Sequence, residues 1–300
     1  MKNQITTILL LLTSTSLFSQ INGVVIDSLT KEKIPYVNIW VENENEGTTS
    51  NENGEFLIEN LDNQKNLVFS AIGYETKHID IKTIQKTIEL NPKIYELKEV
   101  NISPKQENIE TIIGEFSKSE IYQYFGCGKL PWIVTRFFPF EEIFNQTPYI
   151  KKIRLLTRSE VKDSRFNVRL YSVNESGEPG NYIYDENIIG IAKKGKKNTE
   201  IDISYLNFRV PEKGFFIAIE WFIIEQNKYH YDYSMLGSKE RLKGISYEPN
   251  IGTVPRDKDE NSWFYVKGKW GKVQKNNSSL IKDEYKDKYS MLAIELTLTN

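Results

Sequence analysis

The chain has 300 residues, and its 39 basic and 41 acidic side chains give a formal net charge of -2. Because the two signs are interspersed along the chain, no broad basic face is expected, which argues against nucleic acid as a partner. A length of 300 residues favours two domains of ordinary size, and 17 Tyr, 15 Phe and 5 Trp residues are typical of a β-rich fold.

Residues 1–19 have the composition of a secretory signal peptide. Lys2 precedes an apolar stretch over 5–12, and small polar residues follow as far as Ser19. The apolar part is too short to span a membrane. We therefore expect cleavage after Ser19 and export of a chain without a transmembrane segment. Since Cys127 is the one cysteine, an intramolecular disulfide is excluded.

Residues 20–91 form short alternating runs separated by turn residues, which predicts strands. In the run YVNIWVE, Val37, Ile39 and Val41 share one face, whereas Trp40 falls on the other. One buried and one exposed face is typical of an antiparallel sandwich. An exposed Trp40 would mark an interaction surface, with a partner or with a second domain.

This segment also resembles the carboxypeptidase regulatory-like domain. The resemblance rests on a G-x-V-x-D strand, a proline before a V-N-I strand, the stretch GTTSNENGEF and a later S-x-x-G-Y motif: Gly23, Val25, Asp27, Pro35, 47–56, Ser70, Gly73 and Tyr74. It implies a prealbumin-like β-sandwich without catalytic activity. The family recurs in envelope proteins of Gram-negative bacteria, so the resemblance implies a binding or scaffolding role in the periplasm or at the outer membrane and cell surface.

Beyond this segment, residues 92–108 are polar and contain two prolines, which predicts a linker. Strand patterns resume over 109–300 and predict a larger β-sandwich of jelly-roll type. The stretch 215–224 is apolar on both faces apart from Glu220, as in a central strand. A short helical turn is expected over 120–125, with Ser119 as its cap.

The stretch GTTSNENGEF places oxygen-bearing side chains at alternate positions before a glycine, which invites comparison with a calcium loop. Thr49 and Asn60, at the first and last ligand positions, lack the carboxylate that a tight site needs. Asn53-Gly54 is a strong hairpin signal, since both residues tolerate positive φ. We therefore predict a β-hairpin turn here, and neither a metal nor a cofactor for the chain.

Catalytic candidates are few. Cys127 lies between two glycines, and a thiolate nucleophile would need a base such as His230 beside it. Glu220 is a carboxylate on an apolar strand, which is costly unless it is paired or used. Structural roles are expected for both, Glu220 with a Lys or Tyr partner, and the protein is expected not to be an enzyme.

Aromatic residues supply the candidate ligand-binding site. Tyr229, Tyr231 and Tyr233 fall on one side of an extended strand, and Trp263 and Trp270 occur near a Lys-Gly turn. Such rings could stack on sugars, or they could be core and edge residues of a sandwich. Three functions remain open: a protein interaction module is preferred, a carbohydrate-binding accessory protein is second, and a hydrolase is third. The expected partner is thus an envelope protein or a glycan.

Overall fold

The computed structural model describes residues 20–59, 65–93, 108–235, 237, 240–278 and 281–300. The predicted signal peptide and most of the predicted linker lie outside the described residues. Within these ranges the regular elements are strands and short 3-10 helices, and no helix has the length and apolar character needed to cross a membrane. The predicted all-β class, built from sandwiches, is confirmed. The 3-10 helices are Ile81–Thr83, Lys118–Glu120, Glu142–Asn145, Ser204–Leu206, Glu225–Asn227 and Asp283–Tyr285.

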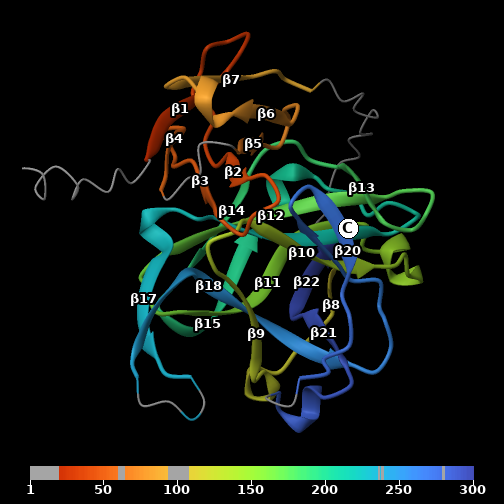
Figure 1. Ribbon diagram of the computed structural model, residues 1–300. Coiled ribbons are helices and arrows are strands. Elements are labelled where there is room, and N and C mark those ends of the chain that lie inside the picture. Colours follow the sequence, from red (N-terminus) through yellow and green to blue (C-terminus); the bar gives the residue numbers. More distant parts are fainter. Residues whose placement is uncertain (1–19, 60–64, 94–107, 236, 238–239, 279–280) are drawn as a thin grey trace, which may run out of the picture.

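The N-terminal sandwich, at the top of Figure 1, packs a sheet of order β4-β1-β7 against a sheet of order β3-β2-β5-β6. Its strands are β1 Ile21–Asp27, β2 Asn38–Val41, β3 Gly47–Thr49, β4 Glu55–Ile58, β5 Asn66–Ser70, β6 Lys77–Asp80 and β7 Thr87–Leu90. Alternation sets the core: in β4, Phe56 and Ile58 are buried while Glu55 and Leu57 are exposed. Each large side chain buried in this way stabilises the fold by about 1.5–3 kcal/mol.

The Asn53-Gly54 turn is present, but the hairpin prediction is wrong. The strands that flank it belong to different sheets, β3 pairing with β2 and β4 pairing with β1. Asn51 Oδ1 accepts hydrogen bonds from Asn53 N and Glu55 N, at 2.9 and 3.0 Å. This side chain closes the turn, so the chain crosses from one sheet to the other instead of folding back on its neighbour.

The C-terminal sandwich packs a seven-stranded sheet against an eight-stranded one. The first has the order β13-β12-β16-β10-β19-β20, with β14 also on β12; the second has the order β17-β18-β11-β22-β8, with β15 on β11 and with β9 and β21 on β18. The first sheet contains β10 Trp132–Phe138, β12 Ser164–Val173, β13 Pro179–Tyr182, β14 Ile188–Ala192, β16 Phe215–Trp221, β19 Trp263–Val266 and β20 Lys269–Lys272. The second contains β8 Glu110–Ile113, β9 Gln123–Cys127, β11 Tyr149–Ser159, β15 Gly195–Asp202, β17 Lys228–Tyr233, β18 Leu242–Arg256, β21 Tyr289–Leu292 and β22 Ile294–Thr299.

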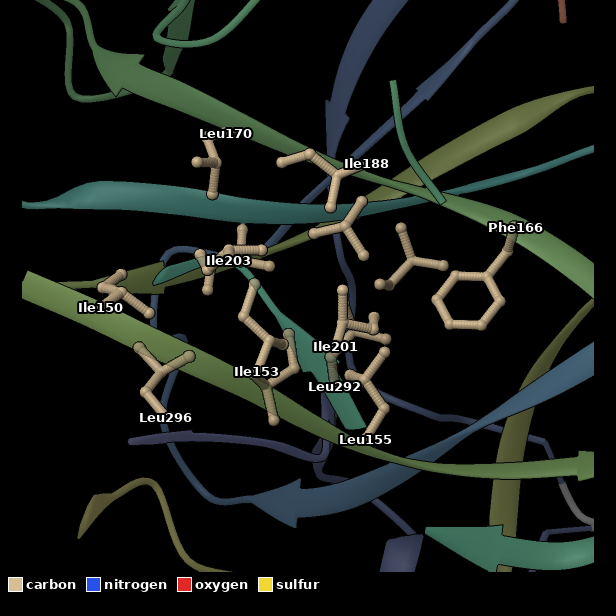
Figure 2. Packing of buried hydrophobic residues seen from close by; sticks show 14 of the residues in the cluster. Ile150, Ile153, Leu155, Phe166, Leu170, Ile188, Ile201, Ile203, Leu292 and Leu296 are labelled. Atoms are coloured by element: carbon tan, nitrogen blue, oxygen red, sulfur yellow. The ribbon is translucent and has the colours of Figure 1, made fainter. Parts of the chain in front are cut away.

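The core of this sandwich lies between the two sheets, where aliphatic side chains from β11, β12 and β22 interdigitate (Figure 2). The predicted central strand is confirmed as β16, which pairs with β10 on one side and β12 on the other. Its odd-numbered residues face the core, while Phe216, Ala218 and Glu220 lie on the outer face. The N-terminal domain docks on this outer face at Glu220, through Asn38.

The helical turn expected over 120–125 is wrong. A 3-10 turn occupies Lys118–Glu120, and residues from Gln123 onward form β9, which pairs with β18. Burial explains the difference, since Ile121 is 1% exposed and packs with Leu156 and Ala293. Tertiary contacts with a long strand outweighed a weak local cap signal.

Candidate functional site

The edge of β3 joins the N-terminal domain to the C-terminal one through its backbone and its threonine hydroxyls. Thr49 N donates to Ile223 O at 3.0 Å, and Ile223 N donates to Thr49 Oγ1 at 2.9 Å. Thr48 Oγ1 also donates to Ile223 O, at 3.3 Å. The two threonines of the GTT stretch therefore serve in the contact between domains, which no pattern in their own segment revealed.

Glu220 lies beside this contact in a buried network. Its Oε2 accepts hydrogen bonds from Arg169 Nε at 2.7 Å and from Asn167 Nδ2 at 3.1 Å. Its Oε1 accepts one from Asn38 Nδ2 of the N-terminal domain, at 2.6 Å. Burial alone would lower the pKa of Arg169, but the charge of Glu220 raises it above its ordinary value. The carboxylate that the sequence singled out is thus ion-paired with an arginine, where a Lys or Tyr partner was expected.

A small cavity of about 20 Å³ lies against this network. Trp40, Tyr182 and Tyr265 line it, together with Arg169, whose second terminal nitrogen is buried without a hydrogen-bond partner in the part of the chain described. Its volume suits one water molecule, which needs about 10–15 Å³. A sugar ring does not fit there.

Trp40 is buried, with 6% of its surface exposed, and lies in this contact between the domains. The expectation that its face of β2 is exposed is therefore wrong, because all four residues of β2 are buried. The neighbouring Tyr36 ring stacks on Phe222, with centroids 4.3 Å apart and planes at 8°. Arg165 donates to the Tyr36 hydroxyl at 2.9 Å and pairs with Glu52 at 2.7 Å. The C-terminal domain covers the Trp40 face of β2, which would be exposed in an isolated N-terminal sandwich.

The three predicted tyrosines form a row on β17. The centroids of Tyr229 and Tyr231 are 6.3 Å apart with planes at 19°, and those of Tyr231 and Tyr233 are 5.8 Å apart with planes at 44°. Tyr231 is 40% exposed and Tyr233 43%, whereas Tyr229 is half-buried. Gly244 lies opposite Tyr231 on β18, and a Cβ there would stand 2.5 Å from the ring. The glycine thus makes room for the ring to lie flat on the neighbouring strand.

This row stands at an edge of the molecule. β17 ends the eight-stranded sheet and pairs only with β18 among the described strands, and Figure 1 shows the hairpin at the left margin. The residues of β17 are exposed or half-buried on both of its faces. The row is therefore open to another molecule.

Trp263 and Trp270 lie elsewhere, on the outer face of the seven-stranded sheet. Both are half-buried. The Trp270 ring packs edge-on against Tyr171 at 5.4 Å, and Lys272 Nζ lies 5.3 Å from the Trp263 ring. These tryptophans do not lie beside the tyrosine row. Both pack against other side chains of their own sheet.

Cys127 and His230 lie on opposite sides of β18. Cys127 is in register with Tyr247, and His230 with Ile245. The thiol donates to the carbonyl oxygens of Gly128 and Leu130, at 3.4 and 3.5 Å. Burial raises the pKa of Cys127, which favours the thiol over the nucleophilic thiolate. Among the residues described, no group of three potential ligands is placed to hold a metal ion.

A groove between the domains was missed by sequence reasoning. It has a volume of about 470 Å³ and runs between β4 of the N-terminal domain and the β17–β18 hairpin. Its hairpin wall carries Lys228, Ile245 and Tyr247, which belong to the strand face opposite the tyrosines. No local signal could find it, because its lining comes from four separate parts of the chain: 46–59, Lys129, 223–228 and 245–247.

Residues 21–102 match the family model of the CarboxypepD_reg-like domain. This confirms the resemblance drawn from the sequence, and the match also takes in residues predicted to be linker. No curated protein matches the chain. The chain is also similar to a solved structure of the cysteine protease and lectin-like domains of Cwp84, a surface layer associated protein of Clostridium difficile. The identity is 11% and the TM-score 0.37, over 87% of this chain and 46% of the other.

Proposed function

We propose that the protein is an exported, non-catalytic binding protein of the bacterial envelope, which holds a partner protein on the tyrosine row of β17. The row carries this proposal, since Tyr229, Tyr231 and Tyr233 stand together on an open edge strand. Tyrosine is enriched where proteins meet, because its ring offers apolar area and its hydroxyl a hydrogen bond. The CarboxypepD_reg-like domain supports the same role, as a module docked on the larger sandwich.

The placement of the reactive side chains supports a non-catalytic role. Cys127 is buried and bonded to two carbonyl groups, and Glu220 is occupied by Arg169 and two asparagines. A nucleophile or a general acid must reach a substrate, whereas the Cys127 thiol and the Glu220 carboxylate are both hydrogen-bonded inside the fold.

A second candidate, glycan binding, is favoured by the near-parallel rings of Tyr229 and Tyr231. Ser246 lies opposite Tyr229 and so shares its face. Stacking rings beside polar groups are the usual components of sugar sites.

Photo-crosslinking tests the proposal. A benzophenone amino acid replaces Tyr231 in the full chain, which is exposed to an envelope extract and to a glycan array. The matched control carries the same group at Tyr205, which is 63% exposed on a different part of the chain. We expect one protein to be crosslinked from position 231 alone, and its purified form to lose affinity by roughly 2 kcal/mol or more for the Y229A/Y231A/Y233A variant.

The two candidates give different outcomes. A signal on the glycan array that disappears with the triple variant would favour the sugar over the protein partner. Equal crosslinking from positions 231 and 205, together with a silent array, would refute binding at this row.

A further inference from the structure

The groove between the domains is a second surface, separate from the tyrosine row. Its volume of about 470 Å³ lies within the range of about 300–1,000 Å³ that is usual for ligand clefts. One wall is β4, another is the segment that follows β16, and the third is the hairpin face opposite the tyrosines. The lining includes the apolar side chains of Leu57 and Ile245, which are open to solvent, whereas Phe56, Ile58, Ile223 and Ile224 are buried beneath it.

The β4 wall presents a strand edge that is unpaired at Leu57, since Asn51 already occupies the main-chain N–H and C=O of Glu55. Val25 N donates to Gly54 O at 2.9 Å, and in an antiparallel pair the hydrogen-bonded partners alternate along the strands. Gly23 and Phe56 are therefore bonded to one another, while Leu57 turns its N–H and C=O away from β1. Sheet order confirms that β4 is an edge strand, and the Leu57 side chain is 43% exposed.

The other edge on this side of the domain is already in use. Thr49 of β3 is bonded to Ile223 of the C-terminal domain, and a Cβ on Gly47 would stand 2.6 Å from Pro131. The same docking that covers β3 leaves β4 facing the groove. An open edge of this kind is a template for another strand unless it is protected.

The rim of the groove is acidic. It carries the carboxylates of Glu46, Glu55, Glu59 and Glu225 and the ammonium groups of Lys129 and Lys228. Lys129 pairs with Glu46 and Lys228 with Glu225, at 3.3 and 3.0 Å, so the excess negative charge lies with Glu55 and Glu59 at the two ends of β4. Burial raises the pKa of Tyr247 to about 12, and the charges of Glu225 and Glu46 add to this shift.

We propose that this groove binds an extended, lysine- or arginine-containing segment of a partner protein, which adds to β4 as a further strand. The main chain of the segment pairs with Leu57, its apolar side chains contact Ile245, and its basic side chains face Glu55 and Glu59. Strand addition supplies affinity through the main chain and selectivity through alternate side chains. Charge complementarity favours basic over acidic segments.

The test uses the full chain and a fluorescein-labelled hexapeptide of alternating valine and lysine. We expect fluorescence anisotropy to show saturable binding, and the matched valine–glutamate peptide not to bind. The E55K/E59K variant should weaken binding by about tenfold. The control E212K reverses an exposed carboxylate in the loop before β16, at the opposite end of that strand from Ile223, and should leave affinity unchanged.

Leu57→Pro tests the main-chain contact. Proline is tolerated on an edge where the lost N–H faces outward, and Leu57→Ala removes the side chain while keeping that N–H. We expect about tenfold weaker binding for L57P than for L57A. In the unaltered chain, the peptide should also slow hydrogen exchange at the Leu57 amide, which keeps the test decisive if L57P does not fold.

Other results would overturn the proposal. These are no binding of the valine–lysine peptide, equal binding of the acidic peptide, or an unchanged exchange rate at Leu57 when the peptide is bound. Because the tyrosines lie on the other face of the hairpin, the Y229A/Y231A/Y233A variant should bind the peptide normally. Loss of peptide binding in that variant would mean that the two surfaces are not separate.

Discussion

Replacing Glu220 by glutamine should destabilise the protein severely. Arg169 and Glu220 have side chains that are each 2% exposed, so E220Q leaves a buried guanidinium without its counter-charge. Removing one partner of a buried ion pair costs about 3–5 kcal/mol, because the remaining charge is not compensated. Asn38→Ala removes the hydrogen bond that reaches Glu220 from the N-terminal domain and the one that Asn38 accepts from Thr49 Oγ1, and should cost about 1.5–3 kcal/mol.

The double variant R169M/E220L separates charge compensation from packing. Apolar residues of similar size in place of a buried pair are often neutral or stabilising, so this variant should be more stable than E220Q. Urea unfolding followed by tryptophan fluorescence and by circular dichroism gives the free energies of unfolding, and coincident transitions establish that they are comparable. A cost below about 1 kcal/mol for E220Q, or a double variant less stable than the single one, would refute the reasoning.

Three further variants or measurements test other parts of the fold. The backbone N–H of Thr30 donates a hydrogen bond to Asp27, and this bond is the main cause that lowers the pKa of the carboxyl below its ordinary value of 3.8. The ionised Asp27 therefore stabilises the fold above pH 3.8, and this stabilisation is lost as the pH falls through the lower pKa of the folded state. The D27N variant should flatten the acid limb of a stability–pH curve. Gly54→Ala should lower the melting temperature, because Gly54 has φ +70° and a Cβ there would stand 2.8 Å from Val25 O, at a cost of about 1 kcal/mol or more; an unchanged melting temperature would contradict this. The Cys127 thiol should react slowly with Ellman's reagent in the native protein and quickly in guanidinium chloride, since burial raises its pKa; equal rates would show that it is accessible.

Local patterns determined much of this architecture. Alternation in the strand runs predicted the strands of both domains, and the apolar run over 215–224 predicted the central strand β16. The tyrosine row was also local, since residues two apart on a strand share a face. The motifs of the first domain predicted its family, which the match over residues 21–102 confirms.

Only the tertiary structure showed the roles of Glu220, Trp40 and the threonines of β3. Glu220 was recognisable as costly, but its partners come from β12 and from a domain 182 residues away. Trp40 and the threonines of β3 are buried because a second sandwich covers them, and that contact leaves no periodic signal in either partner. The turn at Gly54 illustrates the same limit: the sequence determined that the chain bends there, while the pairing of β3 and β4 with different sheets depends on contacts far along the chain. Short-range sequence patterns determine where strands and turns form, whereas burial against distant segments determines which strands pair.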